Sequence, residues 1–377
     1  MKQSINIVVF NVPYPPNYGG IIDVYYLITA LKAQGIHTIL HCFTYETDRS
    51  HFPSEICKEV YYYKRLTGWR SHLSLLPYNV MSRRSDELLH NLAANPWPIL
   101  FESLHTCYHL NDPRLNDRLT ICRMGNVEHD YYRYLAKACR GLVPKLFHLL
   151  ESRRFYHYQA VLGRARLLLP ISLTDAKYFR QLFPHHRLEF VPAFHAHDSV
   201  VAEPGQSDFI LYHAKLSVHE NEQTALFLVH KVFAGLDCPC VIAGMNPTKR
   251  LTKAARQYPH IRIEANPTAS RMSDLIRQAH IHLLPTFQPT GLKLKLLNSL
   301  FEGRHILVNR LMLAGSGLDE LCHVADSASD MITTCRQLML APFDTAEITR
   351  RERILIPFYT SSCQAAKLRD LISEMIV

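Results

Sequence analysis

Several features that define other protein classes are missing from this chain of 377 residues. No apolar run approaches the roughly 18 residues of a membrane-spanning helix, and the opening MKQSINIVVFNVPYPP is too short and too strand-like for a secretory signal. There is no internal repeat and no low-complexity segment. The ten cysteines are scattered, and the closest pair, Cys238 and Cys240, lacks metal or redox spacing. These absences predict a cytoplasmic protein with reduced thiols.

Recognisable metal and nucleic-acid motifs are missing as well. The 22 histidines include close pairs within 185–187, 195–197 and 280–282, but no HExxH motif and no facial triad occurs. The net charge of +9 is not accompanied by any nucleic-acid-binding module. We therefore expect no metal site and no nucleic-acid partner. The charge instead suits nucleotide phosphates or an anionic membrane face.

Two segments are locally rich in basic residues, 66–90 and 137–158. In the first, Trp69, Leu73 and Leu75 are interleaved with the arginines. A charge cluster is usually only a solvated surface. The apolar residues leave peripheral contact with an anionic membrane as an alternative.

The remaining sequence alternates predicted strands and helices, and its length fits two domains. Strand–helix alternation in both halves predicts two doubly wound α/β domains that face each other across a cleft. We expect domains at 1–196 and 197–358, and a final helical segment at 359–377. The predicted strands are 5–12, 37–43, 59–65, 98–103, 119–124, 166–172, 188–194, 209–216, 240–245, 261–265, 280–285 and 305–309. A long helical stretch is expected at 130–164, and Thr174 is expected to cap the helix after it.

The segment TGLKLKLLNSLFEGRHILVN, residues 290–309, reads as an apolar helix followed by a strand. On a helix, Gly291, Lys295, Asn298 and Glu302 would fall within about 60° of one another. A narrow polar stripe on a buried helix has to face something polar. Together with the free N–H groups at the helix start, this predicts a site for a diphosphate and a ribose.

This segment resembles the donor-sugar motif of GT-B glycosyltransferases, particularly the retaining, nucleotide-sugar-dependent family 4 type. The resemblance implies a GT-B fold with an acceptor-side domain at 1–196, a donor domain at 197–358 and a last helix that crosses back at 359–377. It places Lys295 on the diphosphate, with Lys293 in second place. Asn298 stands where the family has a ribose-binding glutamate, and an amide loses the charge-assisted bond.

Two further matches to this family lie at strand ends. Gly19 and Gly20 open a helix after the first strand, as in the family's N-terminal Gly-Gly loop. Lys215 follows the first strand of the second half, where the family places a basic residue against the phosphates. The alternatives are a plain tight turn for the glycines and a solvated lysine at a strand end.

A fourth match is ICRMGNVEHDYYRYLA, residues 121–136, which resembles a segment of the family's N-terminal domain. The family often has a histidine directly before the asparagine, whereas Gly125 stands here. His105, at the end of the preceding strand, is the candidate to fill that place. The resemblance assigns the acceptor side and catalysis to His105, Glu102, Arg123, Asn126 and Glu128.

The sequence thus predicts an enzyme, a hexosyltransferase-type glycosyltransferase that moves a sugar from a nucleotide-diphosphate sugar to a hydroxyl of a growing glycan or lipid-linked saccharide. The resemblance implies no cofactor, no metal and retention of anomeric configuration. Two alternatives stay open: a GT-B-like sugar-nucleotide binding protein with weakened catalysis, and another enzyme on this scaffold, an epimerase or phosphorylase.

Overall fold

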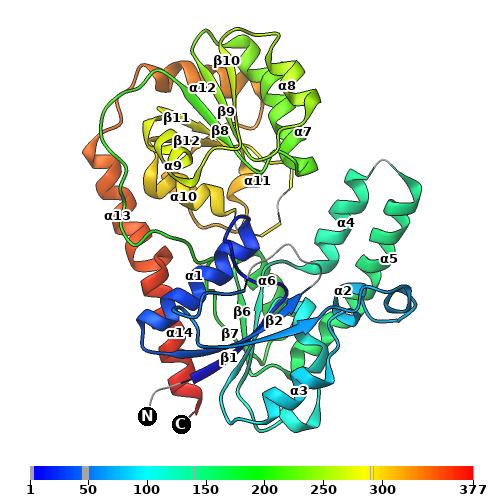
Figure 1. The fold of residues 1–377 in the computed structure, drawn as a ribbon. Coiled ribbons are helices and arrows are strands. Elements are labelled where there is room, and N and C mark those ends of the chain that lie inside the picture. Colours follow the sequence, from blue (N-terminus) through cyan, green and yellow to red (C-terminus); the bar gives the residue numbers. More distant parts are fainter. Residues whose placement is uncertain (1–3, 45–50, 140, 289, 292, 377) are drawn as a thin grey trace. The chain divides into compact units, whose positions relative to one another are not determined.

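The computed structural model describes residues 4–44, 51–139, 141–288, 290–291 and 293–376. The chain divides into two compact units. The first unit comprises residues 1–196, 290–292 and 361–377, and the second comprises residues 197–289 and 293–360. Each unit is built on its own parallel β-sheet (Figure 1).

The sheet of the first unit has seven parallel strands in the order β3-β2-β1-β4-β5-β6-β7. Every residue of β1 is buried, as expected for a continuous apolar run in the centre of a parallel sheet. The strands are β1 (Ser4–Val9), β2 (His37–Thr44), β3 (Glu59–Lys64), β4 (Ile99–Glu102), β5 (Thr120–Met124), β6 (Leu167–Pro170) and β7 (Arg187–Leu188).

Helices cover this sheet. They are α1 (Gly19–Ala33), α2 (Tyr78–Met81), α3 (Asp86–Ala93), α4 (Glu128–Ala138), α5 (Leu142–Tyr158), α6 (Leu173–Leu182) and α14 (Ser361–Ile376), with 3₁₀ turns η1 (Trp69–His72), η2 (Leu104–His109), η3 (Pro113–Leu115) and η4 (Gln159–Arg164). The last helix, α14, shares one hydrophobic core with α1 and β1, to which it contributes Leu368 and Ile372. Arg369 on α14 donates to Gln34 Oε1 at 2.8 Å, next to the end of α1.

The second unit has six parallel strands in the order β10-β9-β8-β11-β12-β13. They are β8 (Ile210–His213), β9 (Cys240–Gly244), β10 (Ile261–Ala265), β11 (Ile281–Leu283), β12 (His305–Val308) and β13 (His323–Val324). Its helices are α7 (His219–Phe227), α8 (Lys249–Ala255), α9 (Ala269–Gln278), α10 (Leu294–Glu302), α11 (Arg310–Leu313), α12 (Ala328–Met339) and α13 (Thr345–Tyr359), with short turns η5 (Leu228–Val232), η6 (Phe233–Gly235) and η7 (Asp319–Leu321).

Three local predictions were wrong. The helical stretch at 130–164 is divided, because Cys139 is extended and Gly141 caps a new helix whose first turn holds Pro144. The strand expected at 188–194 ends at Leu188. The cap of α6 is Ser172, not Thr174, because the Ser172 hydroxyl accepts the N–H of Asp175 at 3.1 Å.

Within the described residues, none of the helices combines the length and the hydropathy that a membrane span requires.

Candidate functional site

The first candidate group lies where β4 ends. Ser103, directly after Glu102, has φ 73° and ψ 149°, a region that costs a non-glycine residue about 1–3 kcal/mol. Its hydroxyl accepts the N–H of His105 at 3.3 Å and starts the 3₁₀ turn η2. This sharp turn places His105 at the carboxyl end of the sheet, where ligands bind in folds of this kind.

Arg123, on β5, is the centre of a buried ion-pair network. It donates to Asp23 Oδ2 and Glu102 Oε1, each at 2.7 Å, and to Asp23 Oδ1 at 2.9 Å. It also donates to the Pro192 carbonyl at 3.1 Å, and Asp23 Oδ1 accepts the N–H of Phe194 at 2.7 Å. Arg123 therefore joins α1, β4, β5 and the segment after β7 inside the first unit.

The charges in this network depend on one another. Burial raises the pKa of Glu102 to about 7, Arg123 opposes the rise and Asp23 adds to it. Burial lowers the pKa of Arg123, but Asp23 and Glu102 outweigh it and hold the pKa above its ordinary value. Because Arg123 is 0% exposed and Glu102 is 5% exposed, these two residues lie in the interior. The structure thus gives them the geometry of positioning residues beneath the surface that the sequence assigned to the acceptor.

His105 and Glu128 form a second pair, in which only the histidine is partly exposed. His105 Nε2 lies 3.3 Å from Glu128 Oε2, and the imidazole packs against the Phe155 ring at 5.3 Å between centroids. The His105 side chain is 18% exposed, so it can meet solvent or a substrate. Glu128 is the first residue of α4, where the helix dipole favours a carboxylate. Gly125 and Asn126, both partly exposed, lie in the loop just before it.

The glycine loop lies at another strand end of the same unit. Gly19 and Gly20 are exposed and form the first turn of α1, with Tyr18 as its N-cap. A Cβ added to Gly20 would lie 3.1 Å from the Phe10 ring, so the pair has a packing reason as well as the predicted ligand-binding one.

In the second unit, the central side chain is Lys295 on α10. Its ammonium lies 5.1 Å from the centroid of the Tyr212 ring, and no hydrogen-bond acceptor or carboxylate for it occurs within the described part of the chain. Burial, with help from the nearby charge of Lys293, lowers the pKa of Lys295 to about 7. A buried ammonium ordinarily needs an anionic partner, and Lys295 has none among the described residues.

One turn further along α10, Asn298 is also incompletely paired. Its Oδ1 is buried and has no hydrogen-bond donor among the described residues. Its neighbour Ser299 is engaged, because His213 on β8 lies 2.9 Å from the Ser299 hydroxyl. Burial lowers the pKa of His213 to about 3, so this histidine is neutral. Lys295 Nζ and Asn298 Oδ1 are therefore two polar atoms of α10 that have no hydrogen-bond partner among the described residues.

The polar stripe predicted for residues 291–302 needs two corrections. First, α10 begins at Leu294 with Lys293 as its N-cap, and Leu292, near which the helix was expected to begin, lies outside the described residues. Gly291 precedes the helix and belongs to the first unit, with φ 64° and so little room that an added Cβ would lie 2.9 Å from Asn126 Oδ1. Gly291 is therefore not one of the residues whose N–H groups are free at the start of α10.

Second, Glu302 has structural partners. His197 lies 3.1 Å from Glu302 Oε1, Ser273 donates to Oε2 at 2.6 Å, and Arg277 lies 3.8 Å away. The part of the stripe without such structural partners among the described residues is thus Lys295 and Asn298. Lys215 is exposed in the loop after β8, where its carbonyl accepts from Val218 and Asn221.

Sequence reasoning missed Asp23 and Tyr212. Asp23 is an acid on the otherwise apolar buried face of α1, and that mismatch was the available signal that a buried cation had to pair with it. The ring of Tyr212 lies beneath the Lys295 ammonium. Nothing in the sequence indicated this role, because an aromatic residue inside an apolar strand is ordinary. Of the close histidine pair at 280–282, His282 lies on β11 and His280 directly precedes it. Both bond to backbone carbonyls, His280 to Leu338 and His282 to Ile276, each at 2.9 Å.

Comparisons with known proteins agree on the architecture. No family model matches the chain. A protein described as an uncharacterized 44.6 kDa protein in the cps region of Klebsiella pneumoniae is 24% identical over 336 residues, which are 83% of this chain and 84% of that protein. Sucrose-phosphate synthase from Thermosynechococcus elongatus is similar in structure, with a TM-score of 0.72 at 12% identity over 99% of both chains.

A second solved structure is the UDP-forming α,α-trehalose-phosphate synthase from Burkholderia xenovorans in complex with glucose-6-phosphate. It has a TM-score of 0.66 at 10% identity over 98% of this chain and all of that one. The fold is therefore GT-B, with two parallel-sheet α/β units, as the sequence predicted.

Proposed function

We propose that the protein is a glycosyltransferase that takes a sugar from a nucleotide-diphosphate sugar. The observation that carries the proposal is the pair of unsatisfied groups on α10, the ammonium of Lys295 and the buried Oδ1 of Asn298. An ammonium suits a diphosphate, and an amide oxygen accepts from a ribose hydroxyl. The GT-B fold and the activities named for the two synthases support the same donor class.

The chemistry requires the protein to stabilise a departing nucleoside diphosphate while a hydroxyl attacks the anomeric carbon. In the proposal, Lys295 and Lys293 meet the charge of the leaving group, with Lys215 and the amides of Gly19 and Gly20 as further donors. Asn298 holds the ribose. These groups supply the electrostatic stabilisation without a resident metal or cofactor.

On the acceptor side we propose His105 and Glu128, with Asn126 beside them, as the groups that contact the attacking hydroxyl. Glu102 and Arg123 hold β4 and β5 in place beneath them. The cps-region relative supports a glycan or lipid-linked saccharide as acceptor and a role in polysaccharide biosynthesis. We also propose that the protein transfers a hexose with retention of anomeric configuration and that it is cytoplasmic.

The proposal is tested with the purified protein and a panel of nucleotide sugars. Mass spectrometry of any nucleotide that co-purifies with the protein identifies the base of the donor. Calorimetry then measures binding to the UDP-, GDP- or ADP-sugars with that base. Binding of at least one member is expected. A protein that binds none of them would overturn the proposal, whereas tight binding without transfer or hydrolysis would favour the sugar-nucleotide binding protein, the alternative that Gly125 and Asn298 support.

A variant pair tests the acceptor side. Replacing His105 with Ala, or Glu128 with Gln, is expected to lower the transfer rate by roughly 10²-fold, the usual contribution of a positioned acid–base group. Nucleotide-sugar affinity is expected to change less than about twofold, because both residues are assigned to the acceptor hydroxyl and not to the donor. Steady-state kinetics and calorimetry on the same samples separate the two effects. A matching fall in affinity would show that His105 does not act on the acceptor.

The lowered pKa of Lys295 predicts a pH-dependent affinity. A diphosphate favours the ammonium, so binding raises the pKa of Lys295 and takes up a proton when the pH exceeds about 7. The dissociation constant of a nucleotide sugar should then increase about tenfold for each pH unit above that value. Calorimetry between pH 6.5 and 9 measures this slope. Lys295→Arg should remove it, since Arg stays protonated, and an equally steep slope in that variant would contradict the assignment.

A further inference from the structure

The first half of α5 exposes apolar side chains in a way that a solvated helix does not. Leu142 and Val143 are each 79% exposed and Leu146 is 65% exposed, and Leu149 and Leu150 are exposed as well. All five belong to one helix, which Figure 1 shows beside α4 in the first unit. Single exposed leucines are normal, but a contiguous group of this size marks an interaction surface.

A second apolar group lies against the same helix. Leu75 is 93% exposed, Leu73 is 73% exposed and Trp69 is 67% exposed. Their segment is anchored to α5 because Arg154 donates to the His72 carbonyl at 3.0 Å and the His72 ring lies 5.9 Å from the Phe147 ring. We call residues 69–76 together with the exposed side of α5 the docking face.

The exposed side of α5 changes from apolar to basic along the length of the helix. At 100° per residue, Leu142, Leu146, Leu149, Arg153 and His157 fall within about 80° of one another. The side is therefore apolar near Leu142 and basic near Arg153, which lies about 16 Å further along the axis at 1.5 Å per residue. With this arrangement the apolar end of α5 could enter the acyl region while the cations further along the helix stay at headgroup level.

The charged residues in and around the docking face are almost all basic. Residues 133–158 contain six Lys and Arg against one acid, and residues 66–84 contain three Arg and no acid. The single acid, Glu151, is buried, where it accepts from Arg154 and from the N–H of Tyr78, each at 2.8 Å. These two stretches, of which the docking face is a part, thus contain nine cations against one acid, a net charge of +8.

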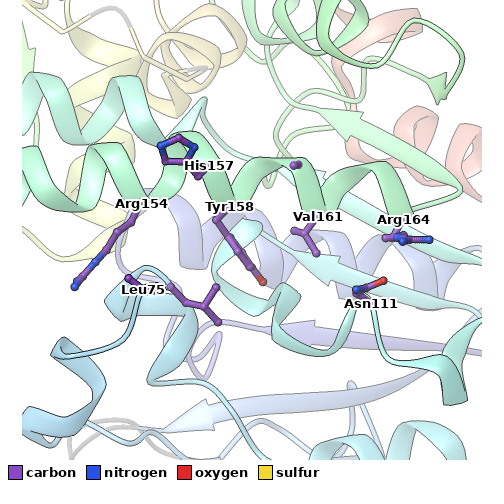
Figure 2. A pocket seen from close by; sticks show the side chains of 9 residues that line it. Leu75, Asn111, Arg154, His157, Tyr158, Val161 and Arg164 are labelled. Carbon is purple, nitrogen blue, oxygen red and sulfur yellow. The ribbon is translucent and has the colours of Figure 1, made fainter.

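Two hollows flank α5, and both are lined by arginine. One, of about 490 Å³, lies between α5, η4 and the Leu75 segment and includes Arg154 and Arg164 (Figure 2). Tyr158 projects from α5 in this view, and its hydroxyl is buried with no partner among the described residues. The other hollow, of about 510 Å³, includes Arg133 and Arg153. Each hollow therefore offers arginine cations to a phosphate.

We propose that the docking face binds an anionic lipid bilayer, with the leucines of α5 and the side chains of Trp69 and Leu75 in the acyl region and the arginines on lipid phosphates. The sequence suggested lipid contact only for the segment around Trp69, and the structure adds the whole outer side of α5. A second copy of this chain is excluded as the occupant by charge, because two such basic faces would repel each other. The inference does not depend on the proposed reaction.

Sedimentation with vesicles tests it. The full chain is expected to sediment with vesicles of phosphatidylcholine and phosphatidylglycerol at low salt, and more weakly with phosphatidylcholine alone. The double variant Leu142→Ser and Leu146→Ser is expected to lower the partition coefficient by on the order of 100-fold. The matched control, Leu311→Ser with Leu340→Ser in the second unit, removes two exposed leucines and should change it less than about twofold.

A charge variant gives an independent measurement. Arg153→Glu should weaken binding to the anionic vesicles about tenfold or more and leave the weak binding to phosphatidylcholine unchanged. Arg256→Glu, which changes an exposed arginine directly after α8, should alter neither. If thermal unfolding shows that either the leucine variant or Arg153→Glu does not fold, the test rests on the one that does.

Three results would overturn the proposal: no sedimentation with anionic vesicles at low salt, equal partition of the leucine variant and its control, or a dimer in light scattering that the leucine variant dissociates. Nucleotide-sugar binding is measured on the same samples. Its absence would count against the proposed reaction alone, so the two failures are distinguishable.

Discussion

Replacing Arg123 with Met is expected to lower the free energy of unfolding of the first unit by about 3–5 kcal/mol, the range for breaking a buried ion pair by removing one partner. Asp23 and Glu102 would then face each other inside the unit without a cation, and the Pro192 carbonyl would lose its donor. The two tryptophans of the chain, Trp69 and Trp97, both belong to the first unit. Urea unfolding followed by tryptophan fluorescence therefore reports on this unit.

Two further variants make this result specific. Arg133→Met removes an arginine that is 55% exposed and paired with Asp130 at the surface, and should change stability by no more than about 0.5 kcal/mol. Adding Asp23→Asn and Glu102→Gln to Arg123→Met removes the stranded charges and should recover part of the loss. A stable Arg123→Met protein that has lost transfer would contradict this account and give Arg123 the direct catalytic role that the sequence assigned to it.

Replacing Lys295 with Met should weaken nucleotide-sugar binding by about 1.5–3 kcal/mol, the contribution of a hydrogen bond to a charged group, which is roughly 10- to 150-fold in the dissociation constant. Methionine keeps an unbranched side chain over the Tyr212 ring. Because the fold lowers the pKa of Lys295 below its unfolded value, the charged lysine costs stability at pH 7, and that cost disappears only as the pH rises toward the ordinary lysine range. The variant should therefore be at least as stable as the parent protein.

Weaker binding together with unchanged or higher stability distinguishes a ligand-binding lysine from a structural one. Calorimetry with the nucleotide sugar that the panel identifies, and thermal unfolding of the same samples, measure both quantities. Lys253→Met, on the exposed side of α8, is the matched control and should alter neither. If Lys295→Met binds the nucleotide sugar as tightly as the parent protein, the donor-site assignment is wrong.

Most of the fold was predictable from the sequence because it depends on local patterns. Largely apolar runs such as residues 5–9 predicted central parallel strands, and strand–helix alternation predicted two α/β units. The helix start at Gly19 was also predicted, because a glycine pair acts over a few neighbours. The prediction failed where boundaries depend on partners, as at Leu188, where the strand ends although the next residues still bond to β6.

The candidate site was predictable only in part. The polar character of Lys295 and Asn298 within an apolar segment was visible in the sequence, and so was their spacing of one helical turn. The role of Glu302 was not, because His197, Ser273 and Arg277 come from three other segments. Gly291 was placed wrongly because the helix start is decided by Lys293 and Leu294 rather than by the spacing of polar residues.

The sequence by itself determined the alternation of strands and helices, the excess of positive charge and the residue types at the strand ends. Only the tertiary structure decided which charges are paired. It brought Asp23 of α1 into contact with Arg123 of β5, one hundred positions away in the chain, and it placed Lys295 over the Tyr212 ring with no anionic partner among the described residues. It also left the leucines of α5 exposed beside Trp69 and Leu75. The physical reason is that pairing and burial are properties of neighbours in space, which no periodicity along the chain specifies.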